Sequence, residues 1–451
     1  MEVEIISREN IKPSSQTPHH LKTYKLTLLD QIIPPVYYPV LLYFPADQPN
    51  FSADVEFISH RILLLKRSLS LSITRFYPFA GIITDSLSVD CNDEGVPFVV
   101  AKVRGCLSNF LDQPDLQRVQ SFLPFAFSWD EKAQGSNVLM IQVNVFDCGG
   151  LVIAINVSHK VADGITLCTF LKDWGLMAQG SSQEIFPDYM AQSIFPQINS
   201  LPDEKHLFSD IKHFLKIAKY VPRRYAFDAL AVSTLKAKST SSAVKSPTRV
   251  EVISAFIWKC FMAAKSGSSS TSLLTHAVNL RRKTVPPLSE NCFGNFLWIA
   301  AAQNSNENET DLRTLVSKIR ESISEIDDDF VKNMQSEKGC PGYYENLEKT
   351  SQRIPKESGI LCFSSWCKFG IYDIDFGWGR PIWASNCVPA YSESLLLNSV
   401  TLMDTRSGDG IEALVILDEK YVAAFENNKE LLAFASIDPS PMVLGKQALL
   451  S

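Results

Sequence analysis

The sequence lacks any apolar run long enough to cross a bilayer. Its most apolar early segment, IIPPVYYPVLLYFP, is shorter than the roughly 20 residues of a membrane helix and contains four prolines. The acidic start, MEVEIISREN, has no apolar signal core, and the final GKQALLS matches no common retention or lipidation signal. Dense Lys/Arg runs are also missing, and the net charge is −6. We therefore expect a cytoplasmic protein that binds neither membrane nor nucleic acid.

Paired cysteine motifs and an esterase motif are missing as well. The ten cysteines are scattered without a Cys-x-x-Cys, which argues against a zinc site or a small disulfide scaffold and predicts reduced thiols. No Gly-x-Ser-x-Gly occurs, so a serine-esterase elbow is excluded. His159 and Asp163 have a spacing that can serve a metal, but no third ligand lies nearby, and we expect no bound metal or cofactor.

The chain is long and mixes two kinds of secondary-structure signal. Its 451 residues, 45% of them hydrophobic, exceed what one compact core usually needs, so two large domains are expected. Residues 96–103 and 138–146 are rich in β-branched residues and predict strands, whereas 54–76 has helical periodicity. This mixture predicts an α/β fold of the mixed α+β kind. Polar, Ser-rich stretches at 179–184 and 238–247 bracket a zone expected to hold a crossover between the domains.

The first chemically informative motif is His-x-x-x-Asp in VIAINVSHKVADGITL, residues 152–167. If residues 150–159 form a strand, His159 shares a face with the apolar residues of that strand. Burial there keeps the imidazole neutral near pH 7, and only a neutral imidazole is a general base. The alternative, non-catalytic interpretation is that His159 is a hydrogen-bonded core histidine. The motif alone does not decide between the two.

A second motif lies far downstream, in YDIDFGWGRPIW at residues 372–383. It contains Asp375, Phe376, Gly377, Trp378 and Gly379. Two glycines separated by a tryptophan permit a tight turn beside bulky aromatic residues. Taken by itself, this is a structural turn.

Together, His-x-x-x-Asp and Asp-Phe-Gly-Trp-Gly make the chain resemble the plant BAHD acyltransferases. Further segments fit, namely FYPFAG (76–81), FDCGGL (146–151), SHKVADG (158–164), PTRVEVISAFIWKC (247–260), AVNLR (277–281), FGNF (293–296) and MDTRSGDGIEA (403–413). The likeness covers essentially the whole chain. Within the family the sequence is most similar to the alkaloid acetyltransferases.

The resemblance implies two chloramphenicol acetyltransferase-like domains, each a mixed sheet with helices, and a solvent channel between them. It places an N-terminal domain at residues 1–190 plus about 377–397. A crossover loop follows at 191–215, and the C-terminal domain comprises 216–376 plus about 398–451. Acyl-CoA and an acceptor alcohol are expected to enter from opposite sides of a monomer, with His159 between them.

The resemblance also implies roles for individual residues. His159 is expected to be the general base, and Asp163 to pair with Arg281 as a structural brace. Ser364 and Trp366 are expected near the oxyanion, with the Trp366 indole N–H as its donor. The turn at 375–379 is expected to be structural. The remaining expectation is that Thr248 and Arg249 contact CoA.

The implied activity is transfer of acetyl from acetyl-CoA to a hydroxyl of a plant specialised metabolite, most simply a monoterpene indole or related alkaloid. Malonyl-CoA users in the family often carry Tyr-Phe-Gly-Asn-Cys, whereas this chain has CFGNF at 292–296. That departure favours a small neutral acyl group. The alternatives are malonyl or another donor, a non-alkaloid alcohol, or a binding protein on the same fold that has lost turnover.

Overall fold

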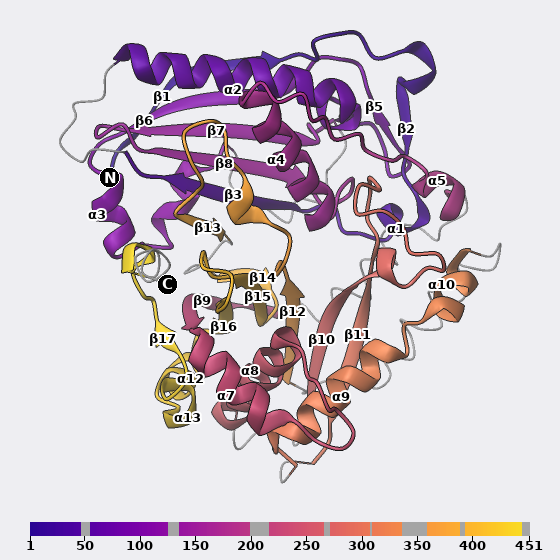
Figure 1. The fold of residues 1–451 in the computed structure, drawn as a ribbon, viewed down its shortest axis with the longest axis vertical. Coiled ribbons are helices and arrows are strands. Elements are labelled where there is room, and N and C mark those ends of the chain that lie inside the picture. Colours follow the sequence, from indigo (N-terminus) through magenta and orange to yellow (C-terminus); the bar gives the residue numbers. More distant parts are fainter. Residues whose placement is uncertain are drawn as a thin grey trace.

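The computed structural model describes residues 1–46, 55–124, 135–198, 216–265, 271–306, 309–335, 359–387 and 393–443. Two large sheets dominate it, one above the other in the view of Figure 1. Within the described residues, no helix is long and apolar enough to cross a membrane. None of the nine cysteines in this part of the chain forms a disulfide.

The first sheet has the strand order β1-β6-β7-β8-β3-β13. Its strands are β1 (Val3–Ile11), β6 (Val96–Val103), β7 (Leu139–Phe146), β8 (Leu151–Ser158), β3 (Tyr37–Phe44) and β13 (Trp383–Asn386). Only the β6–β7 pair is parallel among these neighbours. The strands predicted at 96–103 and 138–146 are confirmed as β6 and β7.

The second sheet has the order β11-β10-β12-β15-β16-β9-β14, with β17 also pairing with β9. Its strands are β11 (Leu297–Asn304), β10 (Ser272–Asn279), β12 (Gly359–Ser365), β15 (Ser399–Asp404), β16 (Ile411–Asp418), β9 (Lys216–Phe227), β14 (Glu393–Leu396) and β17 (Ser436–Ile437). A small third sheet joins β2 (Thr23–Lys25), β5 (Ser88–Asp90) and β4 (Ile82–Ile83).

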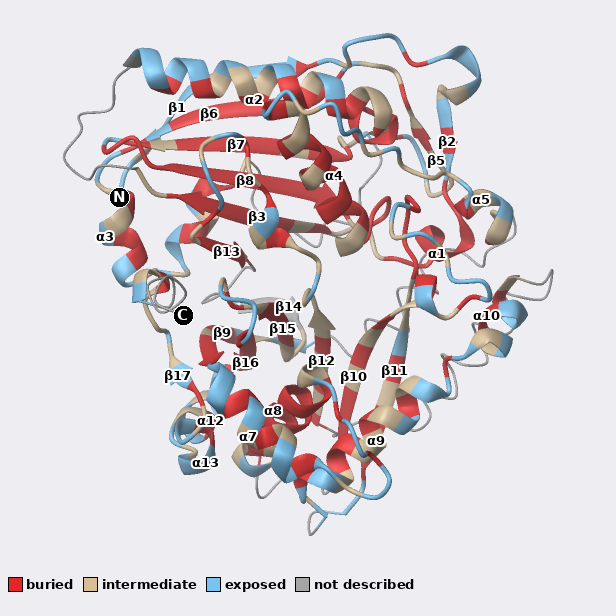
Figure 2. Cartoon of the chain, viewed as in Figure 1, coloured by how far each residue is buried: buried red, intermediate tan, exposed pale blue. Residues whose placement is uncertain are grey.

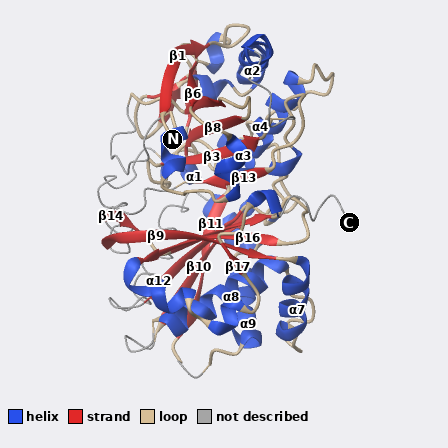
Figure 3. Cartoon of the chain, turned by 90° about the vertical axis from the view of Figure 1, so that its left-hand side faces the viewer, coloured by secondary structure: helices blue, strands red, loops and turns tan. Residues whose placement is uncertain are grey.

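Helices cover both large sheets, and Figure 3 shows those of the second half on the side of their sheet away from the first. The helix predicted at 54–76 is confirmed as α2 (Val55–Arg75), which packs on α4 (Gly164–Ala178). The others are α1 (Leu28–Gln31), α3 (Leu107–Asp112), α5 (Ala191–Ile194), α7 (Ala229–Ser239), α8 (Arg249–Ala264), α9 (Leu312–Ser324), α10 (Asp328–Gln335), α12 (Glu419–Glu426) and α13 (Lys429–Leu432). The mixed α/β class is thereby confirmed.

The apolar residues divide into separate cores around the two sheets, and burial is continuous along the central strands (Figure 2). Strand β8 is buried along its whole length. Its residues Leu151, Ile153, Ile155 and Val157 belong to the core beneath α2 and α4, as the alternation predicted, while Val152 and Ala154 face a second cluster. A strand buried on both faces has little freedom, so the residue that follows it is firmly placed.

The chain does not divide between the sheets in simple order. Strand β13 joins the first sheet although β12 and β15, before and after it in sequence, both belong to the second. The domain boundaries given above stay a prediction. Most of the predicted crossover loop, residues 199–215, lies outside the described residues, and α5 occupies its first four positions.

Candidate active site

His159 directly follows β8 and is held at the junction of the two sheets. Its backbone N–H donates to the carbonyl of Val36, 2.8 Å away. The imidazole meets the edge of the Tyr38 ring at 4.8 Å between centroids, and Tyr38 in turn meets Trp366 at 5.8 Å. Tyr38 belongs to β3 of the first sheet, and Trp366 follows β12 of the second. The residue as a whole is half-buried.

The surroundings of His159 set its protonation state. Burial lowers the pKa of the imidazole below its ordinary value, and this effect outweighs the charge of Asp163 and the hydrogen bond with Asn295. Desolvation disfavours the charged ring because the interior solvates it less well than water does. The imidazole is therefore neutral at pH 7 and able to accept a proton.

The contact with Asn295 selects the tautomer. The Asn295 amide nitrogen donates to Asp30 Oδ1 at 2.9 Å and to the His159 carbonyl at 2.8 Å. Its Oδ1 is left as the acceptor facing His159 Nδ1, 3.1 Å away. The proton therefore resides on Nδ1, and the lone pair is on Nε2. Within the described residues Nε2 has no hydrogen-bond partner.

Asp163 makes no hydrogen bond to the imidazole and instead begins α4. Its Oδ1 accepts from Thr166 N at 2.9 Å as an N-cap, and its Oδ2 accepts from Phe296 N at 3.0 Å. Burial raises the pKa of this carboxyl, but the charge and hydrogen bonds of Arg281 reverse the effect and bring it below its usual range. The carboxylate is ionised and fully occupied by partners other than His159.

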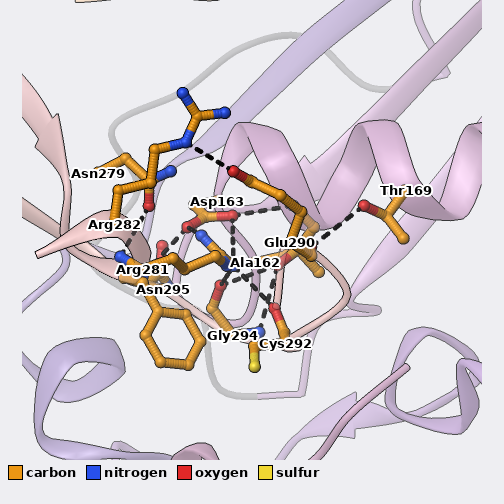
Figure 4. Close-up of polar contacts among 12 residues, drawn as sticks. Ala162, Asp163, Thr169, Asn279, Arg281, Arg282, Glu290, Cys292, Gly294 and Asn295 are labelled. Atoms are coloured by element: carbon orange, nitrogen blue, oxygen red, sulfur yellow. Dashed lines mark hydrogen bonds and ion pairs between the residues drawn. The ribbon is translucent and has the colours of Figure 1, made fainter. Parts of the chain in front are cut away.

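Arg281 comes from the second half of the sequence and is fully buried. Its two terminal nitrogens lie 2.6 and 3.2 Å from the Asp163 oxygens. The same guanidinium donates to the carbonyls of Cys292 and Gly294, as Figure 4 shows. The structure thus joins the predicted pair into a clamp between the loop after His159 and the 3-10 turn that follows β10.

The Asp-Phe-Gly-Trp-Gly turn lies at the other end of α4. Asp375 Oδ1 accepts from the N–H groups of Gly377 and Gly379 at 2.7 and 3.0 Å, and both glycines have positive φ angles of 98° and 101°. A side chain on Gly175, near the end of α4, would come within 2.7 Å of the Asp375 carbonyl. At about 1.5 Å per helical residue, this contact lies roughly 18 Å along α4 from Asp163. The turn therefore lies far from the loop that contains His159 and Asp163.

Trp366 and Ser364 lie at the end of β12, on the side of the junction opposite His159. Neither the Trp366 indole N–H nor the Ser364 hydroxyl has a hydrogen-bond partner among the described residues. Gly164, directly after Asp163, permits the close approach, because an added Cβ would lie 2.9 Å from Phe369 and 3.6 Å from Trp366. Both residues therefore have donors free for a ligand.

Thr248 and Arg249 are occupied by the protein itself. Thr248 caps α8 in a reciprocal pair with Glu251. Arg249 lies 2.8 Å from Asp404 and donates to the Gly408 carbonyl at 2.6 Å. Contact with CoA therefore requires these side chains to share or exchange partners, and their predicted role stays a prediction.

Sequence reasoning missed two residues of this site, Asp30 and Asn295. Nothing in the sequence marks Asp30, or Asn295 within FGNF, as a neighbour of His159. They lie 265 residues apart in the sequence, and Asn295 is 136 residues from His159. A buried polar trio assembled over such distances leaves no periodicity in a single sequence. The one local signal was Thr27 followed three residues later by Asp30, a helix-start pattern.

Two mixed sheets that meet at a neutral, half-buried histidine form a site suited to general-base chemistry. Residues 1–432 match the model of the Transferase family, and the chain belongs to this family of BAHD acyltransferases. The family uses acyl-CoA as co-substrate.

Relatives of the chain are similar over nearly their full length. The epi-neemfruitin B 7-O-acetyltransferase of Melia azedarach is 46% identical, with 98% of this chain and 100% of the relative covered. The limonoid 7-O-acetyltransferase of Citrus sinensis is 42% identical with the same coverage. The crystal structure of vinorine synthase, an enzyme of Rauvolfia serpentina, matches with a TM-score of 0.78 at 32% identity, covering 96% of this chain and 99% of that one.

The relatives do not all carry acetyl in their names. An N-malonyltransferase of Strychnos nux-vomica is 34% identical over 97% of this chain and 91% of its own. The family therefore determines acyl transfer, and the donor has to be argued from the chain.

Proposed function

We propose that this protein is an O-acetyltransferase that moves acetyl from acetyl-CoA to a hydroxyl group of a rigid polycyclic plant metabolite, with His159 as the general base. The observation that carries this proposal is the tautomer of His159. An Nε2 lone pair without a partner among the described residues, on a half-buried histidine at the junction of two sheets, is available to an acceptor hydroxyl.

The reaction follows from that lone pair. Nε2 takes the hydroxyl proton as the oxygen attacks the thioester carbon, a contribution of about 10²- to 10⁴-fold in rate. The Trp366 indole N–H, which has no acceptor within the described residues, donates to the oxyanion that forms. When the intermediate collapses, the carbon–sulfur bond breaks and the imidazolium returns its proton to the CoA thiolate. No acyl-enzyme is needed.

The acceptor is proposed from the relatives. By their names, the Citrus sinensis relative is a 7-O-acetyltransferase of limonoids and the Melia azedarach relative a 7-O-acetyltransferase of epi-neemfruitin B, so a limonoid-type alcohol is our first candidate. The indole alkaloid alcohol expected from the sequence is the second, supported by the likeness to vinorine synthase. The test uses two panels of acceptors, one of limonoid alcohols and one of indole alkaloid alcohols. Purified protein with acetyl-CoA should acetylate members of one panel, measured by CoA release and product mass. Failure with every alcohol of both panels would overturn the acceptor proposal.

The donor proposal has its own test. Malonyl-CoA carries a carboxylate that needs a positioned cation once it leaves water. Two basic side chains beside the loop of His159 are committed, Arg281 to Asp163 and Lys160 to the carbonyls of Gln31 and Ile33. With equal acetyl-CoA and malonyl-CoA, we expect mainly acetylated product. Mainly malonylated product would refute the acetyl donor and leave the proposed role of His159 as the base unaffected.

A further inference from the structure

Asp30 is a fully buried carboxylate whose two oxygens serve different partners. Oδ2 accepts from the backbone N–H and the hydroxyl of Thr27, at 2.9 and 2.7 Å, and so completes the start of α1. Oδ1 accepts from both the backbone N–H and the side-chain amide of Asn295, each at 2.9 Å. One half of the group thus belongs to a helix cap and the other half to the neighbour of His159.

A reciprocal capping pair like that of Thr27 and Asp30 also begins α8, and there the capping carboxylate has a cation. At α8, Glu251 caps with Thr248 and has Arg320 as its cation, with nitrogen–oxygen distances of 2.5 and 2.6 Å. Asp30 makes no ion pair with any described residue. Leaving a buried carboxylate without a counter-ion is costly unless hydrogen bonds satisfy it, so the Asn295 donors take the place that the cation has at α8.

We propose that Asp30 is a positioning residue for acyl transfer, which acts through Asn295 to hold the His159 imidazole in the Nδ1–H tautomer with Nε2 toward the reactants. This inference rests on His159 being the base. With both Asn295 donors directed at Asp30 and the His159 carbonyl, the amide cannot rotate to present its nitrogen to Nδ1. Without Asp30, rotation becomes possible and favours the opposite tautomer, which has no lone pair on Nε2.

The other ionisable groups around the trio are already committed. Lys160 donates to the carbonyls of Gln31 and Ile33, and Asp163 is paired with Arg281. Burial raises the pKa of the Tyr24 hydroxyl well above its usual value, so Tyr24 is neutral. Burial also raises the pKa of Asp30 itself, to about 6, against the hydrogen bonds from Thr27 and Asn295, and the carboxylate is mainly ionised at pH 7.

The test compares Asp30→Asn with Asp173→Asn. Asp173 is an equally buried carboxylate, but it lies in the second half of α4, pairs with Arg75 and makes no hydrogen bond to the trio. Asp30→Asn should lower kcat by about 10- to 100-fold, by analogy with the groups that orient metal-bound histidines, with KM for acetyl-CoA little changed. The midpoint of the acid limb of kcat/KM should move. Asp173→Asn should lower the melting temperature without moving that midpoint.

A double-mutant cycle shows whether Asp30 acts through Asn295. In an Asn295→Ala background, Asp30→Asn should cost little further activity. Additive losses, or a folded Asp30→Asn with kcat within about threefold of wild type, would overturn the inference. His159→Ala is measured in parallel, since a fully active His159→Ala would refute the base itself rather than the role of Asp30.

A measurement on the wild type decides the matter even if Asp30→Asn does not fold. In protein labelled with ¹⁵N histidine and asparagine, His159 should show a protonated Nδ1 and an unprotonated Nε2 at pH 7. The Asn295 side-chain amide should shift as Asp30 titrates near pH 6. A mixed tautomer, together with an Asn295 amide that does not respond between pH 4 and 8, would rule out positioning by Asp30.

Discussion

Two buried arginines bind carboxylates at the junction of the sheets, in arrangements that differ in one respect. Arg281 of the second half pairs with Asp163 of the first, so the ion pair itself crosses the junction. Arg224 of β9 pairs with Glu412 of β16, and both belong to the second sheet. There the first sheet contributes a neutral group, the Trp383 indole of β13, which donates to Glu412 at 3.0 Å and lies 4.4 Å from the Arg224 guanidinium.

The difference separates two ways of holding sheets together. The ion pair of Asp163 and Arg281 connects the two halves of the chain at the loop that follows His159. We therefore expect stability and catalysis to depend on the same pair. The Arg224 cluster keeps its charges satisfied within one sheet and adds the Trp383 hydrogen bond as a removable link. We expect damage at the first to cost activity beyond the loss of folded protein, and damage at the second to cost stability alone.

The largest effect should come from His159→Ala. This variant is the reference for a loss of activity without a loss of stability. The rate of acetyl transfer should fall by about 10²- to 10⁴-fold, because the general base is lost. The melting temperature should change little, since the ring is not part of either core. Steady-state kinetics and thermal unfolding on the same preparation check both. A variant within tenfold of wild type would show that His159 is not the base.

Breaking the crossing pair comes next. Asp163→Ala and Arg281→Ala should each cost about 3–5 kcal/mol in the free energy of unfolding, because the remaining charge is buried and unpaired. The double variant should lose less than the sum of the single losses. Denaturant unfolding measures the cost, and activity per folded molecule should fall as well. A stable Asp163→Asn with selectively lost turnover and a displaced pH–rate profile would instead put Asp163 in proton transfer.

The second arrangement should respond more mildly to Trp383→Phe. This change keeps the stacking on Tyr43, whose ring lies 4.5 Å away, but removes the indole N–H that donates to Glu412. A hydrogen bond to a charged group contributes about 1.5–3 kcal/mol, and we expect a loss of that size in unfolding free energy. Activity per folded molecule should be unchanged. If Trp383→Phe instead reduced kcat at unchanged stability, the second arrangement would not act on stability alone, and the proposed difference between the two would be wrong.

The smallest expected difference is in pH dependence. The pKa of His159 lies below 6.5, so kcat/KM should be full at pH 7 and fall as the pH drops through that lower value and the base is protonated. Because Trp383 lies away from His159, Trp383→Phe should share the wild-type acid limb. pH–rate profiles of the two proteins provide the comparison, and a midpoint clearly above 6.5 in either would contradict the burial argument.

Local patterns predicted the parts of this site that depend on neighbours in sequence. Alternation predicted which residues of β8 face the core, and composition predicted β6 and β7. The two glycines of the 375–379 turn predicted a tight turn with backbone angles that only glycine adopts readily, and both have positive φ. The pairing of Asp163 with Arg281 could not be derived from spacing and came only from family resemblance.

The sequence by itself determined the strand that ends just before His159 and the family motifs, because strand alternation and tight turns act over a few residues. Only the tertiary structure decided which nitrogen of His159 is free. That depends on the direction of one amide, Asn295, and the amide is directed by a carboxylate 265 residues away. A hydrogen bond depends on atoms meeting within about 3 Å, and loops from distant parts of the chain meet at that distance only when both sheets and their helices have packed.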